Sequence, residues 1–259
     1  MMLNYKGTEV FYEDSGSGTA VMLLHGFLEN SSVWESLKTV LVKKYRVVTI
    51  DLLGHGQTGC LGYVHTMEMM ADMVKTVLNE LKIRRVVLIG HSMGGYVSLA
   101  YAEEHPDDVK GLVLVNSTVR ADSEEKKKNR DRAIKAVKQS HKDFVRMGVS
   151  NLFRPKNRRI FSEEIKKLKK EALKTPLQGI VAALEGMKVR NDREILLHFT
   201  PFRKMMMIGK KDPVLNYNDL IDQIEGTETE KVEFPDGHMS FIENKVQFIE
   251  NIKNFLKKI

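Results

Sequence analysis

The chain has 259 residues, which fits one large domain or one domain with an inserted subdomain, and its 42% hydrophobic residues are ample for a buried core. A single cysteine, Cys60, excludes an intramolecular disulfide framework and any four-cysteine metal site. No run of about 18 apolar residues occurs, and the N-terminus lacks the apolar stretch of a signal peptide, so we expect a cytoplasmic protein without a membrane span.

The first 118 residues alternate short β-rich runs with helical patterns. A hairpin is expected around Gly7, pairing residues 5–6 with 10–12. The continuous apolar run at 20–24 predicts a strand that is buried on both faces. Ser32-Val-Trp-Glu35 matches a capping box that would begin the first helix. The same alternation predicts strands at 45–50, 85–89 and 111–115, and helices at 66–81 and 93–104.

Between residues 119 and 197 no strand is evident, only charged helical stretches such as 163–174 and 178–188. This segment also carries the chain's basicity, because residues 119–193 hold 22 basic and 10 acidic residues while the rest holds 19 and 24. Alternation then resumes with a strand at 204–208, a helix at 217–224, a strand at 231–234, and a C-terminal helix that opens with a second capping box at 240–243.

We therefore predict an α/β fold: a mostly parallel, twisted sheet of about eight strands, flanked by helices, with a helical cap inserted after the sixth strand. The predicted core domain comprises residues 1–118 and 198–259, and the predicted cap, or lid, comprises residues 119–197.

The motif Gly90-His-Ser92-Met-Gly94 follows a predicted strand directly and precedes a helix. This is G-x-S-x-G in its strand–turn–helix context, where the tight turn exposes the serine hydroxyl above the sheet. A Cβ atom at Gly90 or Gly94 would collide with the neighbouring backbone. Ser92 is the candidate nucleophile, and the N-terminus of the following helix favours a developing oxyanion.

A serine nucleophile needs a base that is oriented by an acid. His238 lies between the last predicted strand and the last helix, and Asp212 follows the strand at 204–208. Both residues therefore lie at the carboxyl ends of parallel strands, where open α/β sheets build their sites. The chain order Ser92, Asp212, His238 is typical of α/β hydrolases.

His25-Gly26-Phe27 follows the strand at 20–24. Gly26 allows the backbone to approach a substrate, and the backbone N–H groups of Phe27 and Met93 form the candidate oxyanion hole. We expect His25 to be buried and hydrogen-bonded to the backbone, with a structural role.

Taken together, these motifs resemble the capped, esterase/lipase-like branch of the α/β-hydrolase superfamily over essentially the whole chain. The resemblance implies Ser92 as nucleophile, Asp212 as acid, His238 as base, Phe27 and Met93 as oxyanion donors, and a helical insert that covers the pocket. The matching segments are HGF at 25–27, DLLGHGQT at 51–58, GHSMGG at 90–95, GKKDPV at 209–214 and GHM at 237–239.

Other chemistries are less well supported by the sequence. The G-x-G-x-x-G at residues 54–59 lacks the following helix that a dinucleotide phosphate requires, so it is assigned to structure. The eight histidines contain no H-E-x-x-H or clustered ligand set, so we expect no metal and no cofactor. Cys60 is interpreted as a small apolar filler.

The predicted function is hydrolysis of a small carboxylic ester through an acyl-enzyme. Alternatives on the same triad are a C–C bond hydrolase, a lactonase, and a lyase of the menaquinone-pathway type; the alternative outside enzymology is a ligand-binding receptor. Activity is expected to fall on acidification as His238 protonates. Apolar pocket residues are predicted to include Leu152, Phe153, Val214 and Met239.

The basic insert predicts no nucleic-acid or membrane partner, because its lysines alternate with acids and lack interleaved aromatics. A solvated helical face is the first interpretation, and attraction of an anionic ester substrate is the second. Cap arginines that could surround such an anion are Arg120, Arg146 and Arg154. Oligomeric state does not follow from the sequence.

Overall fold

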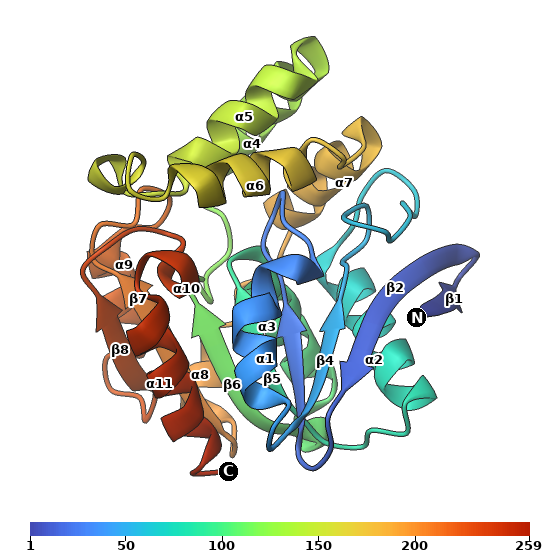
Figure 1. The fold of residues 1–259 in the computed structure, drawn as a ribbon, viewed down its shortest axis with the longest axis vertical. Helices are drawn as coiled ribbons and strands as arrows, with labels where there is room; N and C mark the ends of the chain where they lie inside the picture. The colour runs from blue at the N-terminus through green and yellow to red at the C-terminus, as the bar shows by residue number, and fades with distance from the viewer.

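Eight strands form a single sheet in the order β1-β2-β4-β3-β5-β6-β7-β8 in a computed structural model that describes residues 1–259 (Figure 1). The first two strands run antiparallel to their neighbours, and the remaining neighbours are parallel. The predicted mostly parallel, eight-stranded sheet is thus confirmed. Its strands are β1 Met2–Tyr5, β2 Thr8–Ser15, β3 Ala20–Leu24, β4 Arg46–Ile50, β5 Val86–His91, β6 Val109–Val115, β7 Arg203–Gly209 and β8 Glu230–Phe234.

Helices cover both faces of the sheet, as the unbroken apolar strands require. In β3, Met22 and Leu24 pack in the cluster that includes α2 and α3, while Val21 and Leu23 pack in the cluster that includes α1 and α11 (Figure 1). The helices are α1 Glu35–Leu41, α2 Met67–Glu80, α3 Met93–Glu104, α4 Glu124–Gln139, α5 His141–Asn151, α6 Ser162–Ala172, α7 Leu177–Lys188, α8 Ile195–Phe199, α9 Tyr217–Ile224, α10 Ser240–Glu243 and α11 Lys245–Leu256.

Both predicted capping boxes are wrong in detail. The N-cap residue is Asn30 rather than Ser32. The Asn30 side chain accepts a hydrogen bond from the Ser32 N–H and begins a 3₁₀ turn that leads into α1. Near the C-terminus, Ser240 begins only the single turn α10, which has no side-chain cap, and the longer α11 follows it. The Glu243 carboxylate instead accepts hydrogen bonds from the backbone N–H groups of Gly237 and Arg154.

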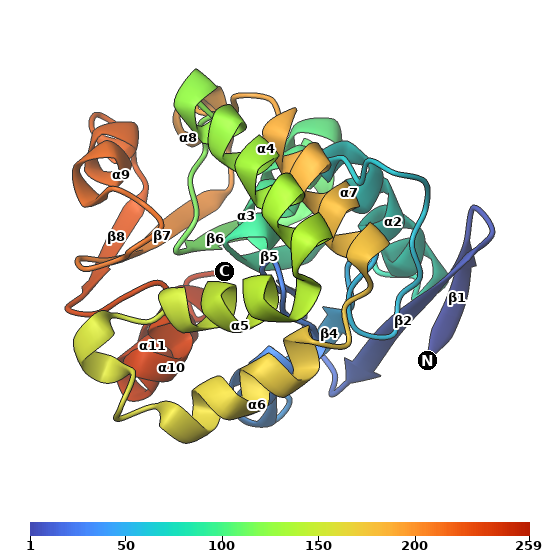
Figure 2. The same ribbon diagram turned by 90° about the horizontal axis from the view of Figure 1, so that it is seen from above.

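The helical insertion α4–α8 follows β6, as predicted, and α4–α7 form a layer above the carboxyl edge of the sheet (Figures 1 and 2). Arg193 anchors the C-terminal end of this insertion to helices α2 and α3. Its buried guanidinium forms ion pairs with Glu68 on α2 at 2.6 Å and with Glu103 on α3 at 2.8 Å. No helix combines the length and the apolar character that crossing a bilayer demands. The exact division into core and cap stays a prediction.

Candidate active site

Ser92 occupies the turn between β5 and α3 with φ of 48° and ψ of −113°, a strained backbone conformation for a residue with a side chain. The flanking glycines make this turn possible, as predicted. A Cβ atom at Gly90 would lie 2.3 Å from the Gly94 carbonyl oxygen, and one at Gly94 would lie 2.2 Å from the Leu24 oxygen. The Ser92 N–H donates to the Val115 carbonyl at 2.9 Å, which holds the turn against β6.

Asp212 and His238 are brought together by the loops that follow β7 and β8. The His238 Nδ1 lies 2.7 Å from the Asp212 Oδ2, and both side chains are buried. The other carboxylate oxygen, Oδ1, accepts the backbone N–H groups of Val214 at 2.8 Å and Leu215 at 3.0 Å. This set of bonds orients the carboxylate toward the Nδ1 edge of the imidazole.

A further partner of this carboxylate is Asn116, which the sequence analysis did not single out. Its Nδ2 donates to the Asp212 Oδ2 at 3.0 Å and to the Gly237 carbonyl at 3.2 Å. Burial alone would raise the pKa of Asp212, but His238 and these hydrogen bonds outweigh it and hold that pKa below its ordinary value. Asp212 is therefore an anion at neutral pH.

His238 and Ser92 line the same cavity, which has a volume of about 80 Å³. No hydrogen bond joins the Ser92 hydroxyl to His238 in this structure, and catalytic hydrogen bonds often tighten only when substrate is bound. Phe27 lines this cavity as well. Met93 is the first residue of α3, so its N–H has no acceptor within the helix and is available as a donor.

The cavity is also lined by a buried pair, Glu29 and His91, that the sequence analysis did not single out. The Glu29 Oε2 accepts the Gly26 N–H at 2.7 Å and lies 3.1 Å from the His91 Nδ1. The His91 Nε2 donates to the carbonyl of His238 at 3.0 Å. The pair thus connects the loop of the candidate oxyanion hole to the backbone of the candidate base.

Each member of this pair stabilises the charged form of the other. Burial alone would lower the pKa of His91, but the Glu29 carboxylate overcomes this effect and raises it. Burial would likewise raise the pKa of Glu29, but His91 and the Gly26 N–H hold it below its ordinary value. We therefore treat the pair as ionic at neutral pH, with both His91 nitrogens acting as donors.

His25 has the structural role expected from the sequence. Its Nε2 accepts the Leu52 N–H at 2.9 Å, and its Nδ1 lies 2.8 Å from the Gly26 carbonyl. Burial lowers the pKa of His25, which agrees with a neutral ring that accepts one hydrogen bond and donates the other. The imidazole therefore joins the strand β3 loop to the loop that follows β4.

The glycine-rich loop at residues 54–59 is organised around Asp51. The Asp51 carboxylate accepts the N–H groups of Ser31 at 2.7 Å and Gln57 at 2.8 Å. A Cβ atom at Gly56 would lie 2.1 Å from this carboxylate, which explains the glycine without any phosphate ligand. No group of three or more His, Cys, Asp or Glu side chains is placed to hold a metal ion.

The predicted pocket residues divide into two groups. Leu152 and Val214 line the cavity with Ser92, whereas Phe153 and Met239 are fully buried in the apolar cluster that includes α1 and α11. The complete lining is Phe27, Glu29, His91, Ser92, Tyr96, Arg130, Leu152, Met187, Val214 and His238.

The cap arginines proposed from the sequence are engaged elsewhere. Arg120 pairs with Glu194 and Asp222, each at 2.6 Å. Arg154 pairs with Asp236 at 2.9 Å, and Arg146 is exposed beside Asp143. None of the three lines the cavity over Ser92. The arginine that does so is Arg130 of α4, which the sequence analysis did not single out.

Residues 19–245 match the family model of the α/β hydrolase fold. The chain is also similar to a solved structure of a thermophilic esterase from Thermogutta terrifontis with malate bound. The two are 30% identical with a TM-score of 0.92, and the match covers 99% of this chain and 96% of that one.

Among curated proteins, a pimeloyl-[acyl-carrier protein] methyl ester esterase of Aliivibrio salmonicida is 26% identical over 263 residues, which is 96% of this chain and 97% of that protein. Other relatives match over a shorter stretch. A non-heme haloperoxidase of Rhodococcus erythropolis is 40% identical over 100 residues, which is 38% of this chain and 36% of that protein. The chain spans about a third of the length of such relatives.

Proposed function

The chain belongs to the α/β-hydrolase family of enzymes, and from that membership we propose that it is a serine hydrolase that cleaves a small carboxylic ester. The single observation that carries the proposal is the convergence on one cavity of a strained Ser92 and a His238 held by a buried Asp212. The esterase activity named for two full-length relatives supports the same reaction class.

In the proposed reaction His238 removes the proton from the Ser92 hydroxyl as the oxygen attacks the ester carbonyl. The oxyanion that forms is stabilised by the N–H groups of Phe27 and Met93. His238 then gives its proton to the departing alcohol, which leaves an acyl-enzyme. Water repeats the sequence, giving one proton to His238 and releasing the carboxylic acid and Ser92. Asp212 holds the imidazole in the required tautomer throughout.

The small cavity and its mixed lining support a short group at the reacting end of the substrate. We also propose that residues 119–197 act as the cap over this site. Support comes from the lining itself, since Arg130, Leu152 and Met187 come from α4, the segment after α5, and α7. The layer of α4–α7 above the carboxyl edge of the sheet agrees with that role (Figure 2).

The test is hydrolysis of p-nitrophenyl esters from acetate to decanoate by the wild type, Ser92→Ala and Ser162→Ala. Ser162 is a partly exposed serine of α6 outside the cavity and serves as the matched control. We expect turnover that is highest for short acyl chains, lost in Ser92→Ala and retained in Ser162→Ala. A fluorophosphonate probe should label the wild type but not Ser92→Ala.

Two other outcomes would contradict the proposal in different ways. Labelling of Ser92 without turnover of any ester would favour the C–C hydrolase, lactonase or lyase alternatives, which share the nucleophile. Neither labelling nor turnover would favour a ligand-binding receptor built on a hydrolase scaffold.

A further inference from the structure

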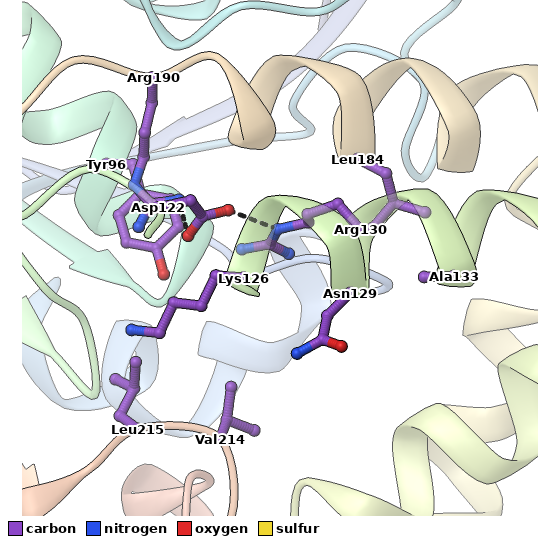
Figure 3. A pocket seen from close by; sticks show the side chains of 10 residues that line it. All are labelled: Tyr96, Asp122, Lys126, Asn129, Arg130, Ala133, Leu184, Arg190, Val214 and Leu215. Carbon is purple, nitrogen blue, oxygen red and sulfur yellow. Dashed lines mark hydrogen bonds and ion pairs between the residues drawn. The ribbon is translucent and has the colours of Figure 1, made fainter. Parts of the chain in front are cut away.

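The cavity over Ser92 adjoins a second and larger one beneath the cap. The second cavity has a volume of about 220 Å³, and it shares Tyr96, Arg130 and Val214 with the first (Figure 3). An extended substrate whose carbonyl lies at Ser92 therefore has space to continue past Arg130. The chemistry of this second cavity decides which kind of substrate tail fits there.

The charged side chains of this second cavity are unbalanced. Three cations line it, namely Lys126, Arg130 and Arg190, together with one carboxylate, Asp122. Asp122 is buried between the two arginines, with its oxygens 2.9 Å from the Arg130 Nε and 2.7 Å from the Arg190 Nη1. One carboxylate can neutralise only one of these cations, so the cavity carries a positive surplus.

Arg190 is occupied by structural contacts. It is buried, its guanidinium lies 4.2 Å from the centroid of the Tyr96 ring, and it donates to the carbonyls of Met187 at 3.0 Å and Arg120 at 2.9 Å. Together with Asp122 it therefore forms the rigid back of the cavity.

Unlike Arg190, Arg130 and Lys126 have donor groups that form no hydrogen bond or ion pair within the chain. Arg130 is 22% exposed and uses only Nε toward Asp122, so its two terminal nitrogens form no hydrogen bond within the chain. Lys126 lies one turn earlier on α4, is exposed, and has no ion-pair partner. Figure 3 shows Lys126 and Asn129 extending from α4 on the side of Leu215 and Val214, while Arg130 extends toward Asp122.

A guanidinium fork that is held in place through Nε and open at its other two nitrogens matches the geometry of a carboxylate. We propose that Arg130, assisted by Lys126, binds a second, anionic group of the substrate. The substrate class is then an ester that carries a carboxylate remote from the reacting carbonyl, such as a monoester of a dicarboxylic acid. This inference rests on the proposed esterase function and specifies its substrate.

The experiment measures binding in the Ser92→Ala background, where no turnover is possible. The probes are monomethyl glutarate, adipate and pimelate, each compared with the methyl ester of the uncharged acid of the same chain length, by titration calorimetry. The quantity of interest is the ratio of the anionic to the neutral affinity. We expect at least one chain length to favour the anionic ester by roughly 10- to 100-fold, as a charged hydrogen-bonded pair would.

Arg130→Gln should abolish this preference, and Lys126→Gln should reduce it. Because Arg130→Gln removes a partner of the buried Asp122, Arg130→Lys is included as well; it keeps the positive charge but lacks the planar fork, and should lose most of the preference. Lys135→Gln is the matched control, since it removes one charge from an exposed position of α4 outside the cavity.

An affinity ratio near one at every chain length in the Ser92→Ala background would overturn the inference. So would an equal loss in Lys135→Gln and Arg130→Gln, because that would indicate general attraction to a basic cap. These outcomes are separate from the proposed function, which is judged by turnover of neutral p-nitrophenyl esters in the wild type.

Discussion

The strained backbone of Ser92 predicts an unusual order of stability among variants at this position. Its φ of 48° and ψ of −113° lie in a region that glycine adopts readily and residues with a Cβ atom do not. Ser92→Gly should therefore relieve strain that Ser92→Ala retains. Both variants lose the same hydroxyl and the same proposed activity, so their comparison isolates the effect of the Cβ atom.

The expected size follows from two opposing contributions. Relief of a sparsely populated backbone conformation contributes about 1–3 kcal/mol, whereas the greater entropy of an unfolded glycine costs about 0.5–1 kcal/mol. Ser92→Gly should therefore exceed Ser92→Ala in free energy of unfolding by about 1 kcal/mol. For a chain of this size that corresponds to a melting temperature about 2–4 °C higher.

Urea denaturation followed by circular dichroism measures the difference, and calorimetry supplies the melting temperatures. Ala136→Gly is the control, because Ala136 is exposed within α4 and has an ordinary helical backbone. There the same change from alanine to glycine should destabilise by about 1 kcal/mol. If Ser92→Gly proves no more stable than Ser92→Ala, the inferred backbone strain is not stored at this turn.

Three further predictions follow from packing and charge. Gly94→Ala should lower the free energy of unfolding by about 1–3 kcal/mol, measured in urea, because the added Cβ would lie 2.2 Å from the Leu24 carbonyl oxygen; an unchanged midpoint would contradict the tight turn. Because its pKa is lowered in the folded protein, Asp212 stabilises the fold at pH values above its ordinary pKa. This stabilisation is lost as the pH falls through the pKa of the folded state. The stability difference between the wild type and Asp212→Asn should thus shrink as the pH falls below about 4, and a difference that stays constant from about pH 5 to about pH 3 would count against an ionised Asp212. Arg193→Met should destabilise by about 2 kcal/mol because two carboxylates lose their buried partner, against about 0.5 kcal/mol or less for the exposed control Arg146→Met; equal effects would refute the role of Arg193 as an anchor.

Local patterns were sufficient to predict most of the sheet and its helices. The helices at residues 93–104 and 217–224 and the strand at residues 20–24 have the predicted bounds, and the other strands differ from prediction by one to a few residues at their ends. Helical and strand periodicity act over a few neighbouring residues, so they can be recognised without knowledge of the fold. Capping was less predictable, since Asn30 and Ser32 are both good cap residues and the path of the preceding loop decides between them.

The candidate site shows the same division. The positions of Ser92, Asp212 and His238 after predicted parallel strands sufficed to place them at one edge of the sheet. Asn116, Glu29 and Arg130 carry no local signal of comparable strength. Asn116 meets Asp212 across 96 residues of sequence, and Glu29 meets His91 across 62. Such contacts are decided by how β6, β7 and the loops pack.

The ion-pair partners of the arginines in the insert were likewise decided by the tertiary structure. The sequence by itself determined that the insert is basic and helical, because charge composition and helical periodicity can be read from the order of the residues without knowledge of the fold. It did not determine which arginine lines the cavity over Ser92. Arg120 and Arg154 find carboxylates on other segments once the chain has folded, whereas Arg130 keeps two nitrogens free beside the cavity. An ion pair forms between whichever groups the packing brings within a few ångströms, so only the tertiary structure could assign these partners.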